Sequence, residues 1–437
     1  MLSRRYDREI LALAVPALGA LAADPLVSLI DTAFVGRLGR VELAALGVNV
    51  AVFGFAFIVF NFLAYGTTPM VGKAVGRGDR DAAGRVVANA FVIAAVAGIL
   101  ALTALQLLAR PILAVMGADA TLIDPATSYL RVRALAGPAL LIITAANGAF
   151  RGFQDTRTPL IVTLGVAAVN LVLDPLFIFV FGWGLVGAAW ATTVAQWIGA
   201  VTFLALVYGR LRRSWRVPLR LPSWREVTPF LNVGWALLIR TFSLIAALTA
   251  ATAVATRVGV VEVAAHQVAA QLWLFLALIV DALAIAAQAL VARFVGEGRW
   301  QEARAVSDRL LAMGLLVGVL LGVAFWLGRG LLARAFSDDP QVVAAVLAVF
   351  PFVALMQPLN GLVFVWDGIF MAIEDFRFLA VAMALSALVA ATLLALVLPM
   401  QWGLAGVWWA IVGLMAARAA TVAWRYRPSA GVFRRAA

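Results

Sequence analysis

The sequence predicts an all-α integral membrane protein, with twelve transmembrane helices in two six-helix bundles related by a pseudo-two-fold axis along the membrane normal. Its composition, its long apolar runs and an internal repeat support this prediction. Apolar residues make up 64% and charged residues 13% of the 437 residues, whereas a soluble protein has about 45–50% and about 25%. A soluble fold of this size cannot bury so much apolar surface, so part of that surface must face lipid.

Twelve apolar runs are long enough to span a bilayer, since a spanning helix needs roughly 20 apolar residues. We place them at residues 9–35, 43–72, 86–109, 122–149, 158–182, 184–209, 228–255, 263–292, 305–333, 342–371, 377–400 and 403–424. A β-barrel would have short alternating segments instead, so these continuous runs exclude it. The first run follows three arginines, as a secretory signal does, but it is too long for one and lacks a cleavage site. We therefore interpret it as a retained helix.

The positive charges orient these spans. Of the 34 Lys and Arg residues, twenty-five fall on one side, eight fall on the other side, and Arg240 falls within a span. Arg131 and Arg133 are among the eight. The side richer in Lys and Arg faces the cytoplasm, so we predict a multi-pass protein of the cell inner (plasma) membrane with both termini cytoplasmic. The net charge of +12 fits loops near an anionic leaflet, and we expect no nucleic-acid partner.

The residue types present exclude several kinds of site. The chain has no cysteine and a single histidine, His266, which excludes disulfides, thiolate ligands and multi-histidine metal sites. We interpret His266, near an outer helix end, as an ordinary interfacial residue. No set of residues resembles a nucleophile with its base. We therefore predict that the protein is not an enzyme and has no cofactor, apart from H⁺ or Na⁺ as a coupling ion.

A shift of 220 residues aligns the two halves of the chain. Residues 35–86 match residues 255–306 without a gap at 16 of 52 positions, and the loop at 75–78 matches the loop at 295–298. Each repeat holds an even number of helices, so both insert in the same orientation, as in two-lobed transporters. We divide the chain into an N-terminal lobe with helices 1–6 (1–209), a cytoplasmic linker rich in arginine and proline (210–229), and a C-terminal lobe with helices 7–12 and a cytoplasmic tail (230–437).

Ionisable side chains inside the predicted spans are the candidate functional residues, since a charge at the bilayer centre costs at least about 2.5–3.5 kcal/mol. They are Asp24, Asp31, Asp174, Arg240, Asp281 and, nearer a helix end, Asp367. Asp24 and Asp31 share one side of the first helix and flank Pro25, which can kink it. Asn170 lies one turn before Asp174 on the fifth helix, so these two side chains share a face.

Three of these residues favour a structural interpretation. Asp281 aligns with Asn61 of the first repeat, which favours a polar packing role. Asp367 lies near a helix end, which favours a solvated or capping role. Arg240 can simply pair with a nearby aspartate.

Asp31, Asp174 and Thr192, in contrast, align with apolar residues of the second repeat. We infer that the first lobe alone holds a cation or proton site. An apolar environment favours the protonated form of a carboxyl group, which can then carry a proton. Together with Asn170 and Thr192, the same oxygens can instead coordinate Na⁺, because hard cations prefer oxygen ligands. The residues are therefore compatible with either H⁺ or Na⁺ as the coupling ion.

The first and fifth helices resemble the motifs of a known family. Residues 23–39 (ADPLVSLIDTAFVGRLG) resemble the first-helix signature of multidrug and toxic compound extrusion (MATE) transporters, most closely their DinF branch. The Val-Gly-x-Gly loops of both halves and the segments 147–157 (NGAFRGFQDTR) and 170–175 (NLVLDP) are similar to that family as well. The resemblance covers essentially the whole chain. No residue matches the seventh-helix glutamate of the other branches, which favours the DinF branch.

The resemblance implies a secondary active antiporter that exports organic cations or amphipathic toxic compounds in exchange for H⁺ or Na⁺, by alternating access. It implies a site for a proton or Na⁺ in the N-terminal lobe, formed by Asp31, Asn170, Asp174 and Thr192. Tyr129 and Asn147 would belong to the same polar network. Asp24, Arg240 and Asp281 are additional candidates. The expected partners are a small amphipathic or cationic substrate and membrane lipid, and we expect a monomer.

Two other classes of transporter have a similar architecture. A flippase or exporter of lipid-linked or other amphipathic metabolites would need a basic cavity for its anionic substrates, and Arg240 alone is weak support for such a cavity. A major facilitator transporter would carry Asp-Arg followed closely by glycine and basic residues in one loop. Asp79 and Arg80 match this pattern, but Gly84 and Arg85 follow at the wrong spacing. Both classes stay as alternatives.

Overall fold

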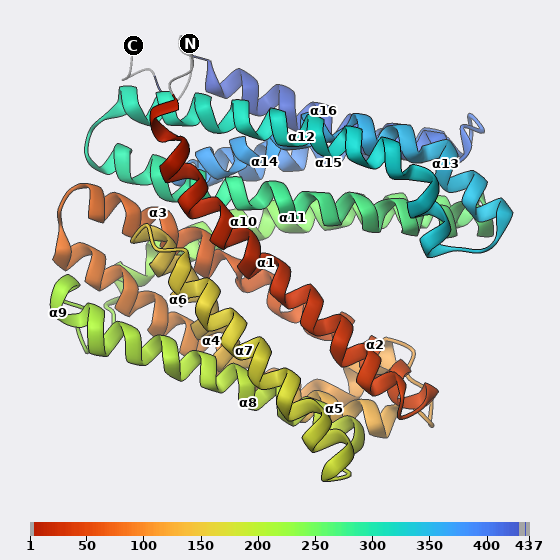
Figure 1. Cartoon of the computed structure of the whole chain (residues 1–437), viewed down its shortest axis with the longest axis horizontal. Coiled ribbons are helices and arrows are strands. Elements are labelled where there is room, and N and C mark those ends of the chain that lie inside the picture. Colours follow the sequence, from red (N-terminus) through yellow and green to blue (C-terminus); the bar gives the residue numbers. More distant parts are fainter. Residues whose placement is uncertain (1–3, 428–432, 434–437) are drawn as a thin grey trace. The chain divides into compact units, whose positions relative to one another are not determined.

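The computed structural model describes residues 4–427 and residue 433, and every regular element in this part of the chain is a helix (Figure 1). The first half contains η1 (Arg4–Tyr6), α1 (Asp7–Gly36), α2 (Arg40–Ile58), η2 (Val59–Asn61), α3 (Phe62–Gly76), α4 (Arg80–Val115), α5 (Ile123–Ala134), α6 (Gly137–Gly152), α7 (Arg157–Pro175), η3 (Leu176–Val180), α8 (Gly184–Ala205), η4 (Leu206–Leu211) and α9 (Arg212–Trp215). The second half contains α10 (Trp224–Val258), α11 (Val260–Gly296), α12 (Trp300–Phe336), α13 (Pro340–Leu355), α14 (Gln357–Ala372), α15 (Phe376–Val397) and α16 (Gly403–Tyr426).

The predicted number of spans is confirmed. Among the described residues, ten helical segments are long and apolar enough to cross a membrane, and the number reaches twelve when each of two bent helix pairs is one span. These segments coincide with the twelve predicted runs to within a few residues at each end. The run predicted at 43–72, for example, is α2, η2 and α3, which form one continuous helical segment. The all-α membrane fold therefore follows from the apolar runs.

The two bent spans occupy equivalent places in the two repeats. The bend between α5 and α6 is 47°, and the bend between α13 and α14 is 48°. Pro138 stands in the first turn of α6, and Pro358 stands in the first turn of α14, 220 residues later. Proline has no N–H and clashes with the preceding turn, so it begins a helix well but does not continue one. Each of these spans was predicted as a single helix, and the bends were not predicted.

Glycines let neighbouring backbones pack closely at these bends, again in both repeats. A Cβ atom added to Gly98 on α4 would lie 2.4 Å from the Cα of Pro138. A Cβ atom added to Gly318 on α12, the equivalent residue, would lie 2.4 Å from the carbonyl oxygen of Gln357. Such contacts leave no room for a side chain. The internal repeat is thus a repeat of packing as well as of sequence.

The chain forms two compact units. The N-terminal unit is Val15–Gly234, and the C-terminal unit combines Met1–Ala14 with Trp235–Ala437. In the N-terminal unit, α6 packs against α3 and α4, and α7 lies beside α8; in the C-terminal unit, α11 packs against α12 and α14. The segment expected as a linker, 210–229, contains α9, the non-helical residues 216–223 and the beginning of α10. The expected linker is therefore helical at both of its ends.

Ion pairs explain why the beginning of α1 belongs to the C-terminal unit. Both carboxylate oxygens of Asp7 accept hydrogen bonds from the guanidinium of Arg309, each at 2.7 Å. Glu9 pairs with Arg293 at 2.9 Å. Paired, bidentate geometry of this kind makes an arginine–carboxylate contact both stronger and more specific.

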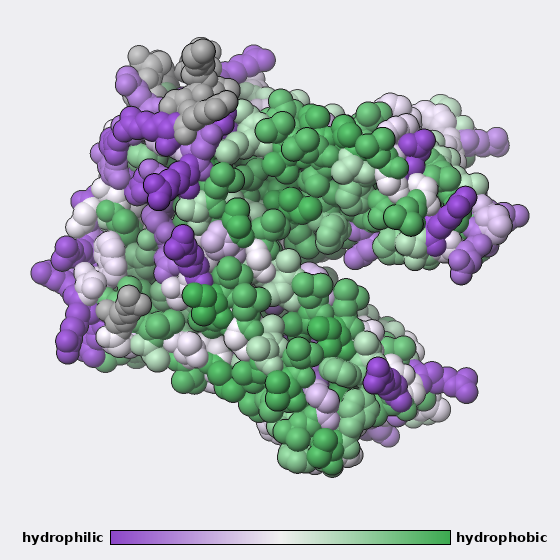
Figure 2. All heavy atoms as spheres, in the orientation of Figure 1, coloured by the Kyte–Doolittle hydropathy of each residue, from purple (hydrophilic) through white to green (hydrophobic). Residues whose placement is uncertain are grey.

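The surface has the pattern that a membrane requires. On the face shown in Figure 2, hydrophobic residues cover the middle of the helices and hydrophilic residues gather at their ends. Large apolar side chains on the surface include Leu29 at 66%, Leu107 at 74% and Leu327 at 76% exposure. Helices with outward-facing apolar side chains satisfy their backbone internally and can therefore lie in lipid.

Candidate functional site

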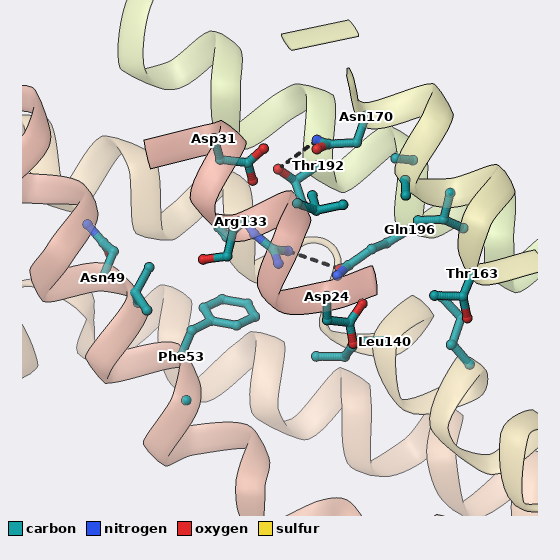
Figure 3. Close-up of a pocket in the computed structure, with 18 of the residues that line it drawn as sticks. Asp24, Asp31, Asn49, Phe53, Arg133, Leu140, Thr163, Asn170, Thr192 and Gln196 are labelled. Carbon is teal, nitrogen blue, oxygen red and sulfur yellow. Dashed lines mark hydrogen bonds between the residues drawn. The ribbon is translucent and has the colours of Figure 1, made fainter. Parts of the chain in front are cut away.

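The N-terminal unit contains a cavity of about 370 Å³, which is within the range of about 300–1,000 Å³ for small-molecule sites. Helices α1, α2 and α5 to α8 supply its lining. The lining includes Asp24, Asp31, Asn49, Phe53, Tyr129, Arg133, Asn147, Asn170, Thr192 and Gln196 (Figure 3). Most of the residues predicted from the sequence as an ion-binding network therefore border one cavity.

Two carboxyl groups meet beside this cavity. Asp31 on α1 and Asp174 on α7 lie within hydrogen-bonding reach of each other. Asn170 joins them, because its amide nitrogen, when turned toward them, donates to Asp31 Oδ1 at 2.9 Å and to Asp174 Oδ2 at 3.3 Å. The same amide lies 3.2 Å from Thr192 Oγ1 (Figure 3). Two carboxyl groups share a hydrogen bond only when one of them carries a proton, and two carboxylates side by side repel each other unless a cation lies between them.

The spacing of α7 brings Asn170 and Asp174 to this place. They are four residues apart on one helical face, and they are 1% and 0% exposed. Directly after Asp174, Pro175 ends α7 and the chain continues as the π-helix η3, a departure from α-geometry that is frequent at functional sites. Asp174 Oδ1 is buried and accepts no hydrogen bond from the described part of the chain. A buried oxygen of this kind needs a partner, and a proton or a cation can be that partner.

Tyr129 and Asn147 border the cavity from the two halves of the bent span α5–α6. Tyr129 is buried on α5, and its side chain lies close to that of Arg133, one turn later. Asn147 lies on α6, and its buried Oδ1 has no hydrogen-bond partner among the residues that the structure describes. Both residues therefore line the same cavity as Asp31, Asn170 and Thr192. Their role in ion binding stays a prediction.

Arg133 lies in the cavity, and its assignment to the outer surface was wrong. Its Nη1 donates to Gln196 Oε1 on α8 at 3.0 Å, and its guanidinium lies 4.6 Å from the centre of the Phe53 ring (Figure 3). Two signals in the sequence could have identified it. Arg133 falls within the predicted span 122–149, and it follows Tyr129 by four residues, which places both on one helical face.

Arg240 belongs to a different cluster, in the C-terminal unit. Its Nη2 donates to Asp367 Oδ2 at 2.5 Å, and Arg418 Nη2 donates to the same oxygen at 2.6 Å. Asp367 is 5% exposed. The expectation that it is a solvated or capping residue near a helix end was therefore wrong, because a buried carboxylate between two arginines is a structural ion pair. Arg240 pairs with an aspartate, as its structural interpretation predicted.

Two further residues also lie in the C-terminal unit, outside the cavity. Asp281 on α11 is close enough to Arg418 to interact with it electrostatically, so it belongs with the charges around Asp367. His266 was expected at an interface, but it is 2% exposed. Its Nε2 lies 3.2 Å from Thr252 Oγ1, and its ring lies 5.8 Å from that of Trp408.

The sequence of both halves matches one protein family. The MatE family model matches residues 16–176 and again residues 237–397, once in each repeat and over more than half of the chain. The chain belongs to the MATE family. MATE proteins are transporters, so the protein is a membrane transporter and not an enzyme. Its assignment to the DinF branch stays a prediction.

Relatives of this MATE protein span most of its length. Protein DETOXIFICATION 44, chloroplastic, from Arabidopsis thaliana is 36% identical, over 96% of this chain and 82% of the plant protein. A probable multidrug resistance protein NorM from Thermotoga maritima is 26% identical, over 81% of this chain and 79% of that protein. Among solved structures, a MATE protein in a bent conformation matches with a TM-score of 0.90 and 20% identity, over 98% of this chain and 96% of the other. An outward-facing MATE transporter matches with a TM-score of 0.87 and 21% identity, over 95% of this chain and 94% of the other. These structures share the fold.

Proposed function

We propose that this MATE transporter exports organic cations or amphipathic toxic compounds in exchange for H⁺ or Na⁺, by alternating access, with its ion site at Asp31 and Asp174. The observation that supports this proposal is the carboxyl pair joined by Asn170, with one buried oxygen of Asp174 left without a hydrogen-bond partner. A pair of this kind is neutralised either by a proton held between the two groups or by a cation bound to both. Thr192 Oγ1 and, with its amide turned so that the oxygen faces the carboxylates, Asn170 would supply the further oxygen ligands that Na⁺ prefers.

Exchange requires the coupling ion to change the relative stability of two conformations. An ion shifts such an equilibrium only as far as it binds one conformation more tightly than the other. Asp31 lies on α1 six residues after Pro25, where the missing backbone N–H makes the helix easier to bend. Loss of the proton or of Na⁺ leaves two like charges on α1 and α7, and their repulsion would favour a conformation in which these helices separate. Binding of the substrate and binding of the ion in this cavity then exclude each other, so release of one accompanies entry of the other.

The proposal is tested by transport in liposomes. Asp31→Asn cannot ionise, so we expect it to reduce gradient-driven movement of a fluorescent organic cation to the level of empty liposomes, while membrane insertion is unchanged. Asp338→Asn is the matched control, because Asp338 is exposed in the described segment between α12 and α13, and it should transport as the parent protein does. Parallel pH and Na⁺ gradients identify the ion. An Asp31→Asn protein that transports at the parent rate under both gradients would contradict the proposed site.

We further propose an orientation, a location and an oligomeric state for the protein. The distribution of Lys and Arg supports cytoplasmic termini, and we propose a monomer of the DinF type in the plasma membrane. The chain has no cysteine, so single cysteines introduced at positions 78 and 338 can be labelled with an impermeant maleimide in intact cells. We expect labelling at 338 and not at 78. The reverse pattern would contradict the proposed orientation.

Neither alternative class is favoured. The match to the MATE family model excludes a major facilitator transporter. A flippase for anionic lipid-linked compounds would need a basic cavity, whereas this cavity is lined by Asp24 and Asp31 as well as by Arg133.

A further inference from the structure

The cavity carries charges of both signs. Among the described residues that line it, Asp24 and Asp31 are acidic and Arg133 is the single basic residue. Asp31 is engaged with Asp174 and Asn170, which leaves Asp24 and Arg133 outside the carboxyl pair. An ionisable group kept in a membrane protein interior is costly and is a functional candidate by default. The ion exchange proposed above assigns a role to neither residue, although Arg133 also interacts electrostatically with Asp31.

Arg133 is held in place by neutral groups. Gln196 accepts a hydrogen bond from its Nη1, the Tyr129 side chain lies close to it, and its guanidinium lies over Phe53. No carboxylate of the described chain forms an ion pair with it, and a guanidinium has more donors than these contacts use. Those donors are arranged as a planar fork, which matches the two oxygens of a carboxylate. Arg133 is therefore positioned and only partly satisfied, as a residue that binds an anionic group should be.

Asp24 is the complementary group. It lies on α1 seven residues before Asp31, borders the same cavity, and its side chain is exposed rather than paired. It is close enough to Arg133 for the two charges to interact, yet the pair is not closed into a salt bridge among the described residues. A compound with both charges can bind between them and gain from each. Phe53, Leu140 and Ile143 supply apolar surface for its uncharged body.

We propose that Arg133 and Asp24 form a two-point site for a zwitterionic, partly apolar substrate, with the guanidinium binding its carboxylate and Asp24 binding its cationic group. This inference rests on the export function proposed above and assigns its substrate class. A purely cationic compound would place its charge near Arg133, and a purely anionic compound would place its charge near Asp24 and Asp31. Both compounds would be repelled by a like charge in the site, whereas a zwitterion would not, and such repulsion is a source of specificity.

The test compares two dyes that differ in one group. One is a rhodamine with a free carboxyl group, which is zwitterionic, and the other is its methyl ester, which is only a cation. Affinity is measured by fluorescence anisotropy with the full-length protein in detergent micelles, so the measurement does not depend on coupling to an ion gradient. We expect the parent protein to bind the free acid about tenfold more tightly than the ester, the factor that one charge-assisted hydrogen bond is worth.

Variants then assign this preference to the two residues. Arg133→Gln should weaken binding of the free acid about tenfold and strengthen binding of the ester, because the repulsive charge is gone. Asp24→Asn should weaken binding of both dyes. Arg133→Lys keeps the charge and should retain part of the preference. Arg131→Gln is the matched control, since Arg131 is exposed on the same helix and does not line the cavity, and it should bind both dyes as the parent protein does.

The possible outcomes separate this inference from the proposed function. Equal affinity for the two dyes in the parent protein, or a preference that Arg133→Gln leaves unchanged, would overturn the two-point site. Gradient-driven transport of both dyes at equal rates would also overturn it, while leaving the exporter proposal supported. Preferential binding of the free acid without gradient-driven movement of either dye would support the site and contradict the proposed exchange.

Discussion

Replacing Asp367 with asparagine should destabilise the protein far more than the same replacement in an exposed ion pair. Asp367 Oδ2 accepts hydrogen bonds from Arg240 and Arg418 at 2.5 and 2.6 Å, and the three side chains are 7%, 12% and 3% exposed. Asparagine keeps the size of the side chain but removes its charge, which leaves two guanidinium groups buried with less compensation. Removing one partner of a buried ion pair costs about 3–5 kcal/mol.

The expected loss of stability is large enough to measure by thermal unfolding. For a unit of this size, each kcal/mol lowers Tm by about 2–4 °C, so we expect Asp367→Asn to lower Tm by about 10 °C. The control is Asp124→Asn, which removes a carboxylate that lies 3.1 Å from Arg110 with both side chains more than half exposed. An exposed pair contributes about 0–1 kcal/mol, so this Tm should change by a few degrees at most.

Intrinsic tryptophan fluorescence of the detergent-purified proteins provides the measurement. Equal Tm values for Asp367→Asn and Asp124→Asn would refute the reasoning, because they would mean that the buried charges of the two arginines do not need the Asp367 carboxylate for their stabilisation. A second variant, Asp367→Asn with Arg418→Gln, should recover part of the loss, since it also removes one of the uncompensated charges.

Two further predictions concern packing and coupling. Gly318→Ala should destabilise the protein by about 1–3 kcal/mol because its Cβ atom would meet the backbone of Gln357. In the control Gly330→Ala on the same helix, the Cβ atom meets nothing within 4 Å, so Tm should be unchanged or slightly raised. Equal Tm values for the two variants would contradict the close contact. Asp174→Asn should abolish gradient-driven transport in liposomes, whereas Asp281→Asn, in a cluster that the proposed exchange does not use, should reduce it much less at equal protein density; the opposite order would contradict an ion site in the N-terminal unit alone.

The sequence predicted the fold well because membrane insertion is decided by local properties. Whether a segment can span a bilayer depends on its length and hydrophobicity, both of which are read directly from the chain. The bends before Pro138 and Pro358 were not predicted, because a proline in a membrane helix is tolerated wherever neighbouring groups satisfy the freed backbone. Whether such a helix bends by 47° or stays straight depends on its neighbours, here on Gly98 and Gly318.

The candidate site could be predicted in part. Asp31 and Asp174 are identifiable because a carboxyl group in a span is costly and therefore stands out. Arg133 was missed, because counting loop charges placed it outside the membrane near Arg131. Asp367 was also misjudged, since its two partners lie more than fifty residues away in the chain and their distance cannot be inferred from sequence spacing.

The sequence by itself determined that this chain is a two-repeat helical membrane protein with carboxyl groups inside its first half. These properties depend on composition and periodicity along the chain, so no knowledge of distant contacts is needed to derive them. Only the tertiary structure decided which charges meet. It joined Asp31 to Asp174 through Asn170, turned Arg133 into the cavity and surrounded Asp367 with arginines. The reason is physical: electrostatic and hydrogen-bond energies depend on separations of a few ångströms between side chains, and those separations are determined by helix packing.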